Sequence, residues 1–172
     1  MKIDLSDAQL ENVAKLCAAL PINPTTNEDL EKIAAAKAAF DALDIHQKAE
    51  FIKDYDLYYD KLSQVEGALS KAVEALKITA SSTAGKGYIK VKWTVKGVAA
   101  AADGYQVYRS TKRNSGFGTK PYFTAKAGAT TYKNTKSLKK GTRYYYKVRA
   151  YKVVDGKKIY SDWSNKAYRI AK

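Results

Sequence analysis

The chain has 172 residues, of which 31 are Lys or Arg and 17 are Asp or Glu, and its formal net charge is +14. No apolar run approaches the ~18–20 residues that a membrane-spanning helix needs, so a transmembrane segment is excluded. One cysteine excludes an intramolecular disulfide and a multi-cysteine zinc site, and one histidine argues against a histidine-based metal centre or catalytic triad.

The charge is divided unequally along the chain. Residues 1–77 carry nine lysines and fourteen acidic residues, which gives a net charge of −5. Residues 78–172 carry 22 Lys or Arg and only three Asp, which gives +19, and they hold eleven of the fourteen tyrosines. Two such compositions, meeting at one point, predict two domains, 1–77 and 78–172.

The first half has apolar residues at helical spacing. Pro21 ends a first helix, Thr26 or Asn27 can cap a second, and Asp44-Ile45-His46-Gln47 forms a capping box for a short third. Each apolar stripe needs a partner, so we expect a three- or four-helix bundle. The stripes include Leu10, Val13, Cys17, Leu30, Ile33, Leu62, Val65, Leu69 and Val73.

Three features of this half could be read as chemistry, and we favour a structural role for each. His46 lies in a predicted first turn with no nucleophile arranged beside it. Cys17 lies on an apolar stripe, as a buried structural thiol does. The run Asp54, Asp56 and Asp60 lacks the glycine and the closing Glu of a calcium loop. We therefore assign no catalytic, cofactor-binding or metal-binding residue here.

A segment of the first half also matches a known pattern. Leu20-Pro21 is followed by Ala38-Ala39-Phe40-Asp41-Ala42-Leu43 and then by Gln47-Lys48. On these residues, the stretch from Leu20 to Leu62 resembles small helical modules of bacterial surface proteins. The pattern covers about a quarter of the chain and predicts a helical module there.

After residue 77 the apolar period changes from 3.6 to 2. Ile89, Val91 and Trp93 alternate with polar residues, as in a half-buried strand, and Asp155-Gly156 is typical of a two-residue hairpin turn. About seven short strands in ~95 residues fit an immunoglobulin-like sandwich. The expected fold class is therefore multi-domain α and β, with an N-terminal helical bundle followed by a seven-stranded β-sandwich.

Several segments of the second half match one family. They are Trp93, the stretch 104–110 (Gly-Tyr-Gln-Val-Tyr-Arg-Ser), the stretch 138–150 and Ser161-Asp162-Trp163-Ser164 after the hairpin. On these residues, 78–172 resembles a fibronectin type III domain of the lysine-rich kind in Gram-positive surface and secreted proteins. The chain has no Arg-Gly-Asp tripeptide, so integrin binding has no support.

Five residues of this half are assigned to structure. Trp93, Tyr105 and Val148 fall at inward positions of the expected strands, where packing accounts for them. The resemblance further implies that Tyr144 is a tyrosine corner, whose hydroxyl bonds the backbone near Leu138. Trp163, in contrast, is expected to be more open.

Cationic and aromatic residues alternate on the expected outward face of one sheet. We take as a possible binding face Tyr108, Tyr145, Lys147, Arg149 and Tyr151, together with Lys90 and Lys92. Lysine stems lying over tyrosine rings can simply make a soluble face. The same charges attract polyanions, with an affinity that falls in salt. Nucleic acid is the least favoured partner, because no binding motif of known geometry occurs.

The expected function is that of a non-catalytic module pair from a bacterial cell-surface or secreted protein. It would act as a spacer and adhesion segment, and would contact anionic cell-wall polymer, a glycan or another surface protein. The alternative is an ancillary segment of a large secreted carbohydrate-active enzyme. The first residues show no signal peptide, so the chain is either cytosolic or an internal piece of a longer exported chain. The resemblance to surface and secreted proteins implies the second, located outside the cell or on its surface. We expect a monomer without cofactor.

Overall fold

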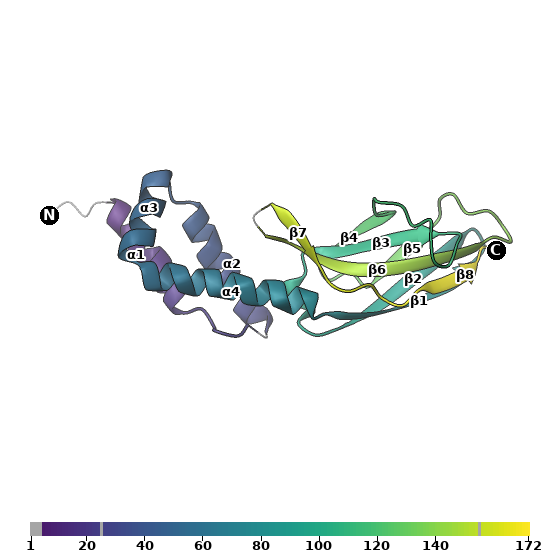
Figure 1. Ribbon diagram of the computed structural model, residues 1–172, viewed down its shortest axis with the longest axis horizontal. Coiled ribbons are helices and arrows are strands. Elements are labelled where there is room, and N and C mark those ends of the chain that lie inside the picture. The colour runs from purple at the N-terminus through teal and green to yellow at the C-terminus, as the bar shows by residue number, and fades with distance from the viewer. Residues whose placement is uncertain (1–4, 25, 155) are drawn as a thin grey trace. The chain divides into compact units, whose positions relative to one another are not determined.

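The computed structural model describes residues 5–24, 26–154 and 156–172, and the side chains of these residues except 5–7, 27 and 100. The chain divides into two compact units, Met1–Lys71 and Ala72–Lys172. Four helices are followed by two antiparallel sheets (Figure 1). The secondary structure changes between the end of the last helix at Glu74 and the first strand at Lys77. None of the described helices is long and apolar enough to cross a bilayer.

The helices are α1 (Leu5–Ala18), α2 (Asn27–Asp41), α3 (Ile45–Asp54) and α4 (Asp56–Glu74). Thr26 caps α2, because its hydroxyl accepts from the Asp29 N–H at 3.1 Å while the Asp29 carboxylate accepts from the Thr26 N–H at 2.9 Å. The predicted capping box at Asp44 and Gln47 is confirmed, with reciprocal distances of 2.9 and 3.0 Å. Both helix starts are therefore set by local hydrogen bonds.

The core of the first unit is built from the predicted apolar stripes. Cys17 and Phe51 are fully buried, and the Phe51 ring meets Phe40 edge to face at a centroid distance of 5.7 Å. Burial raises the pKa of the Cys17 thiol, so this cysteine packs as a small apolar residue rather than as a nucleophile. The other buried apolar residues include Leu10, Val13, Leu20, Ile33, Leu43, Leu62, Val65 and Leu69.

The second unit contains two antiparallel sheets. The small sheet has the order β1 (Lys77–Gly85), β2 (Tyr88–Lys96) and β5 (Thr131–Asn134). The large sheet has the order β4 (Phe123–Lys126), β3 (Gly104–Ser110), β6 (Arg143–Val154) and β7 (Lys157–Tyr160), and β8 (Ala167–Ile170) also pairs with β6. A single 3₁₀ turn, Ala99–Ala101, links β2 to β3.

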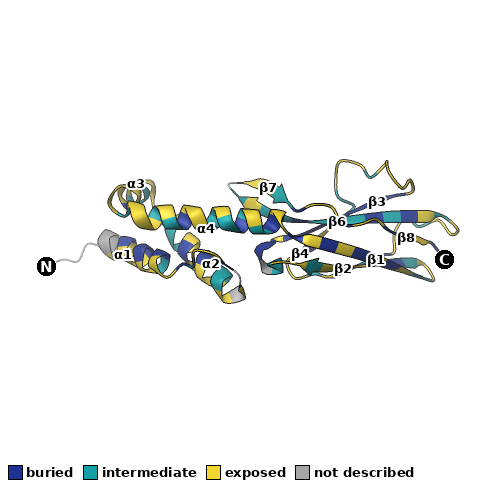
Figure 2. Ribbon diagram, turned by 60° about the horizontal axis from the view of Figure 1, so that its bottom comes forward, coloured by how far each residue is buried: buried dark blue, intermediate teal, exposed yellow. Residues whose placement is uncertain are grey.

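The two sheets face each other across the buried residues of alternating strands. Burial alternates along β1 and β2, as the coloured bands of Figure 2 show. Trp93 from the small sheet lies 5.6 Å from Tyr105 of the large sheet, measured between ring centroids. Asn134 on β5 donates to the Tyr146 hydroxyl on β6 at 2.8 Å. These contacts between sheets fix which face of each strand points inward.

Eight strands occur in the described part of the chain, where seven were expected. The additional strand is β5, whose residues Thr-Tyr-Lys-Asn lack an alternation of apolar and polar side chains. Its place is set by pairing with β2 rather than by its own pattern. At the expected hairpin, Gly156 has a φ of +73° between β6 and β7, while Asp155 lies outside the described residues.

Candidate functional site

The outer face of β6 carries a row of cationic and aromatic side chains. Arg143, Tyr145, Lys147, Arg149 and Tyr151 alternate with buried residues along the strand. Side chains two positions apart share a face of a sheet, so all five point away from the sandwich core. The outward orientation of this part of the expected binding face therefore agrees with the alternation of side chains along the strand.

Two of these cations are held between aromatic rings. The Arg149 guanidinium carbon lies 3.5 Å from the ring centroid of Tyr160 and 4.5 Å from that of Trp163. The Lys147 ammonium lies 3.7 Å from Trp163 and 4.9 Å from Phe117. We call this set of Phe117, Lys147, Arg149, Tyr160 and Trp163 the cation–aromatic ladder. Such contacts stabilise a face that is otherwise rich in positive charge.

The segment 161–164 positions Trp163 over the sheet. After β7 ends, the Ser161 hydroxyl accepts from the Ala150 N–H and the Ser164 hydroxyl accepts from the Val148 N–H, both at 2.9 Å. The Ser164 N–H also donates to the Val148 carbonyl at 2.8 Å. The two serines thus replace strand partners along β6, and the Trp163 ring between them lies against Lys147 and Arg149.

Tyr108 departs from the expectation that it is exposed. It does point outward, opposite Lys147, but only 4% of it is accessible. Trp163 meets its ring edge to face at 5.0 Å, and Arg149 donates to its hydroxyl at 3.3 Å. The neighbouring outward residue Gln106 is equally buried and accepts from the Arg149 Nε at 3.0 Å. The segment 161–164 covers this part of the face, which strand alternation alone does not reveal.

Lys90 and Lys92 do not belong to the same surface. Both are exposed on β2 of the small sheet, next to the inward residues Val91 and Trp93. Because Trp93 faces Tyr105 of the large sheet, the two lysines point away from β6. The structure therefore separates the seven residues of the expected binding face into two outer surfaces.

The residues assigned to structure lie in or beside the core. Trp93, Tyr105 and Val148 are buried, and Leu138 is partly buried. The Tyr144 hydroxyl accepts from the Lys139 N–H at 2.9 Å and donates to the Ser137 carbonyl at 3.2 Å. These two backbone partners flank Leu138. Trp163 is 39% exposed.

Among the described residues, the cations of the ladder form no ion pair with a carboxylate. Burial, together with the charges of Arg149 and Lys166, lowers the pKa of the Lys147 ammonium. In the described part of the second unit, ion pairs join Asp162 to Lys77 at 3.0 Å and Asp103 to Lys152 at 3.5 Å. Both carboxylates are thus engaged with cations outside the ladder.

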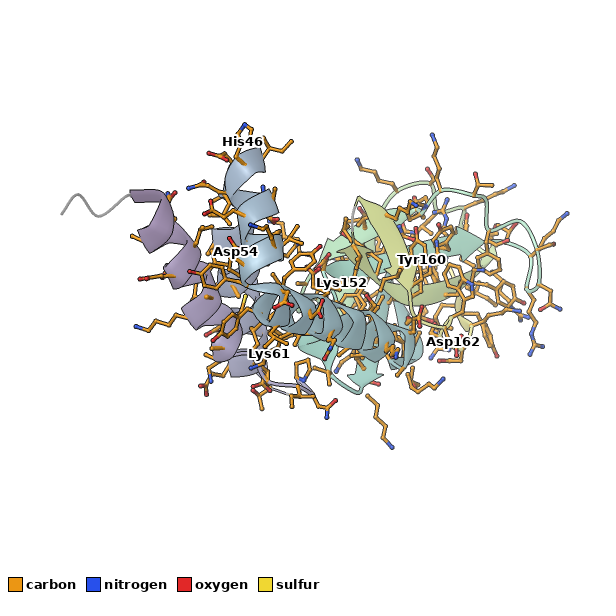
Figure 3. All side chains as sticks on the ribbon, turned by 60° about the vertical axis from the view of Figure 1, so that its left-hand side comes forward. His46, Asp54, Lys61, Lys152, Tyr160 and Asp162 are labelled. Carbon is orange, nitrogen blue, oxygen red and sulfur yellow. The ribbon has the colours of Figure 1, made fainter. Side chains whose placement is uncertain are left out.

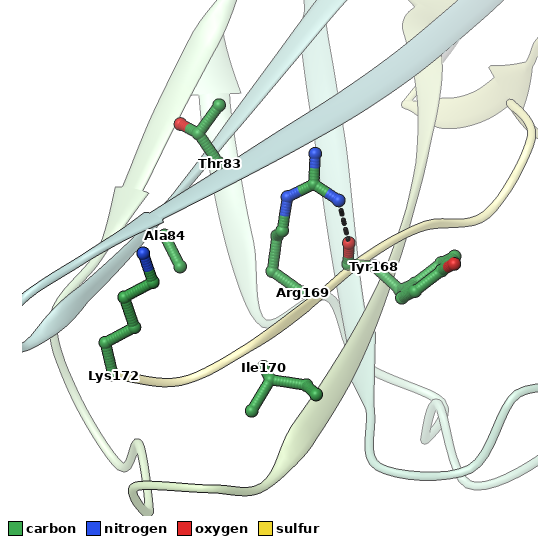
Figure 4. Close-up of a pocket in the computed structure, with 6 residues that line it drawn as sticks. All are labelled: Thr83, Ala84, Tyr168, Arg169, Ile170 and Lys172. Atoms are coloured by element: carbon green, nitrogen blue, oxygen red, sulfur yellow. Dashed lines mark hydrogen bonds between the residues drawn. The ribbon is translucent and has the colours of Figure 1, made fainter.

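Two pockets lie beside β8, and sequence reasoning identified neither. The smaller one, of about 200 Å³, is called here the basic pocket and is lined by Arg113, Arg143, Tyr145, Lys166 and Tyr168. The larger, of about 430 Å³, is lined by Thr83, Ala84, Tyr168, Arg169, Ile170 and Lys172 (Figure 4). Neither lining includes a carboxylate side chain. The pairing of Tyr145 with Tyr168 across β6 and β8 creates the first pocket, and no local pattern predicts that register.

We next consider the residues that sequence analysis examined for metal binding or catalysis. Among the described residues, no group of three or more His, Cys, Asp or Glu is arranged to hold a metal ion. His46 is exposed at the start of α3, where its backbone N–H donates to Asp44, and its ring points away from the helix (Figure 3). The site best defined by geometry is thus the basic outer face of the large sheet.

Comparison with known proteins gives weak similarities. No family model and no curated protein matches the sequence. Among solved structures, pectate lyase Pel3 from Pectobacterium carotovorum aligns over 54% of this chain and 26% of its own, with 15% identity and a TM-score of 0.43. Pectate lyase PelI from Erwinia chrysanthemi, solved with tetragalacturonic acid, aligns over 51% and 26%, with 16% identity and a TM-score of 0.37.

A proposed carbohydrate-binding protein from Bacteroides uniformis aligns over 57% of this chain and 58% of its own, with 13% identity and a TM-score of 0.38. The chain thus spans about a quarter of the length of the two pectate lyases. With TM-scores below 0.5, these similarities identify neither a family nor a function.

Proposed function

We propose that the chain is a non-catalytic pair of modules, a helical unit followed by a fibronectin type III-like domain, from a bacterial cell-surface or secreted protein. In this proposal the pair acts as a spacer, and the second module binds anionic polymers such as cell-wall polymers or acidic glycans. Binding is electrostatic and reversible.

The tyrosine corner supports the fibronectin type III assignment. Its hydroxyl partners, Ser137 and Lys139, flank the residue that the resemblance indicated. The packing of Trp93 against Tyr105 across the two sheets is a second supporting feature. Neither feature depends on the surface charges, so the fold assignment and the binding assignment rest on separate observations.

The charge distribution is the observation that carries the binding proposal. Residues 78–172 have a net charge of +19, and in the described part of this unit the ion pairs of Asp103 and Asp162 involve only Lys152 and Lys77. The remaining cations attract counterions, which a polyanion releases when it binds. A multivalent anionic chain is therefore the partner that this surface favours most strongly.

Cosedimentation of the full chain with an anionic wall polymer tests the proposal. We expect binding at about 20 mM salt and a loss of tenfold or more in affinity at about 200 mM, because screening weakens exposed charges and counterion release loses its advantage. An uncharged dextran of similar length is the control and should not bind. Absence of binding at low salt, or binding that salt leaves unchanged, would contradict the proposal.

A further inference from the structure

The basic pocket lies where three segments of the second unit meet. Arg113 comes from the loop after β3, Arg143 and Tyr145 from the start of β6, and Lys166 and Tyr168 from the approach to β8 and from β8 itself. Cations from all three segments converge on a volume of about 200 Å³. Because pockets for drug-sized ligands span about 300–1,000 Å³, this one suits a single small group.

Two tyrosines form an aromatic wall of this pocket. Tyr145 and Tyr168 are register partners on β6 and β8, and their ring centroids are 5.7 Å apart. The Arg143 guanidinium lies 5.3 Å from the Tyr168 ring centroid. The Tyr168 residue is 49% exposed, so its ring is accessible to a ligand. An apolar face beside cations suits a ligand that has both a carbon skeleton and a negative charge.

The loop that supplies Arg113 is held in place by hydrogen bonds. The Ser110 hydroxyl donates to the Ser115 carbonyl at 2.6 Å and accepts from the Lys112 N–H at 2.9 Å. The Lys166 ammonium donates to the Asn114 side-chain oxygen at 2.8 Å, which ties this loop to the segment before β8. The pocket is therefore largely formed before any ligand binds, which lowers the entropy cost of binding.

The cations of the pocket have no carboxylate partner among the described ion pairs, which involve other residues. Guanidinium groups present planar pairs of N–H donors that match carboxylate and phosphate oxygens. An oxyanion is thus the ligand group that satisfies Arg113, Arg143 and Lys166 together.

We propose that the basic pocket is a subsite for one oxyanion, carboxylate or phosphate, attached to a sugar or polyol unit. Arg113, Arg143 and Lys166 bind the oxyanion, while the rings of Tyr145 and Tyr168 pack against the carbon skeleton of the unit. This inference rests on the proposed function and deepens it, because it assigns one point of the polymer to one place on the domain.

The test compares two variants of the full chain that each lose two positive charges. Arg143→Gln with Lys166→Gln alters the pocket, whereas Lys90→Gln with Lys92→Gln alters the outer face of the small sheet. Affinity is measured for a galacturonate oligomer, which carries carboxylates, and for a glycerol phosphate oligomer, which carries phosphates. For whichever oligomer the unaltered chain prefers, we expect the affinity of the pocket variant to fall at least about tenfold. The affinity of the control variant should fall about threefold or less.

Tyr168→Leu tests the aromatic wall separately. It should weaken binding of the preferred oligomer several-fold and leave binding of inorganic polyphosphate, which has no carbon skeleton, unchanged. Lys166→Gln alone provides a second pocket variant should the double variant show a lowered melting temperature. The lysine is exposed and its described hydrogen bond is to the Asn114 side chain, so its loss leaves the strands intact.

The outcomes separate the two proposals. If the unaltered chain binds neither oligomer nor a longer anionic polymer at low salt, the proposed function fails. If it binds and both double variants weaken binding equally, the proposed function stands and the pocket assignment is wrong. If inorganic polyphosphate, which has no carbon skeleton, binds more tightly than either oligomer and depends on the same pocket residues, the sugar or polyol assignment is overturned.

Discussion

Three consecutive tyrosines of β6 experience three different environments. Tyr144 bonds the backbone beside Leu138, Tyr145 lies on the outer face, and Tyr146 lies fully buried between the sheets, where its hydroxyl accepts from Asn134. The strand turns successive side chains to opposite faces, so the outer residue differs from both neighbours. Tyr144 and Tyr146 share a face but also differ from each other. Tyr144 reaches the backbone beside Leu138, whereas Tyr146 reaches Asn134 of the opposite sheet. The same chemical group therefore has a different role at each position.

Removing the hydroxyl of Tyr144 should destabilise the second unit. Tyr144→Phe leaves the Ser137 carbonyl and the Lys139 N–H without their partner, and Ser137 has a positive φ of 54° that this bond helps to hold. We expect a loss of about 1–2 kcal/mol in the free energy of unfolding, measured by chemical denaturation. Tyr145→Phe is the matched control and should change it by less than about 0.5 kcal/mol. Equal effects of the two changes would contradict the role of the corner.

Tyr146 should make the second unit sensitive to alkaline pH. Burial raises its pKa to about 12, whereas an exposed tyrosine titrates near 10. Since the folded state favours the neutral phenol, this contribution to stability is complete below about pH 10 and is lost as the pH rises towards 12. The unaltered chain should lose roughly 2–3 kcal/mol more than Tyr146→Phe over this range. Denaturation curves for both proteins that fall in parallel would exclude it.

At the scale of elements, β6 is the strand on which most of the second unit depends. It pairs with β3, β7 and β8. Between the stretches that pair with β7 and with β8, its backbone N–H groups donate to the serine hydroxyls of the segment 161–164. The ladder then fixes this irregular segment against the sheet through Arg149 and Lys147. Lys147 and Arg149, which sequence analysis assigned to a possible binding face, therefore also help to stabilise the domain.

Replacing Arg149 by lysine tests this structural role. The guanidinium stacks between Tyr160 and Trp163 and donates to Gln106 and Tyr108, and an ammonium cannot reproduce that planar set of donors. We expect Arg149→Lys to lower the free energy of unfolding by about 1–3 kcal/mol in thermal or chemical denaturation. Arg169→Lys, on exposed β8, keeps the same charge and should have almost no effect. A ladder that only solubilises the surface would give no difference between them.

Local signals predicted the elements, whereas contacts between distant segments did not follow from the sequence. The Asp44 capping box and the alternation around Trp93 depend on residues within a few positions, so both could be read directly. The burial of Tyr108 depends on Trp163, 55 positions later, and the basic pocket joins residues from 113 to 168. β5 was missed because its pairing with β2 supplies what its own composition lacks.

At the scale of the whole molecule, each unit carries its own natural reporter. The single cysteine is buried in the first unit, and both tryptophans lie in the second. Because each unit has its own core, we expect denaturation followed by Cys17 thiol reactivity and by tryptophan fluorescence to give separate transitions. Tyr144→Phe should move the fluorescence transition and leave the thiol transition in place. A shift of both by the same amount would show that the units unfold together.

The position of residue 172 has a mechanical consequence. Its carbonyl accepts from the Gly87 N–H, at the hairpin between β1 and β2, whereas residue 77 lies at the opposite end of β1. Nine residues of strand, about 30 Å, separate the two points. A pull applied between them runs along β1 and loads its hydrogen bonds with β2 in shear, all at once, rather than opening them one after another. A strand pair loaded in this way resists a larger force than one whose hydrogen bonds open in sequence.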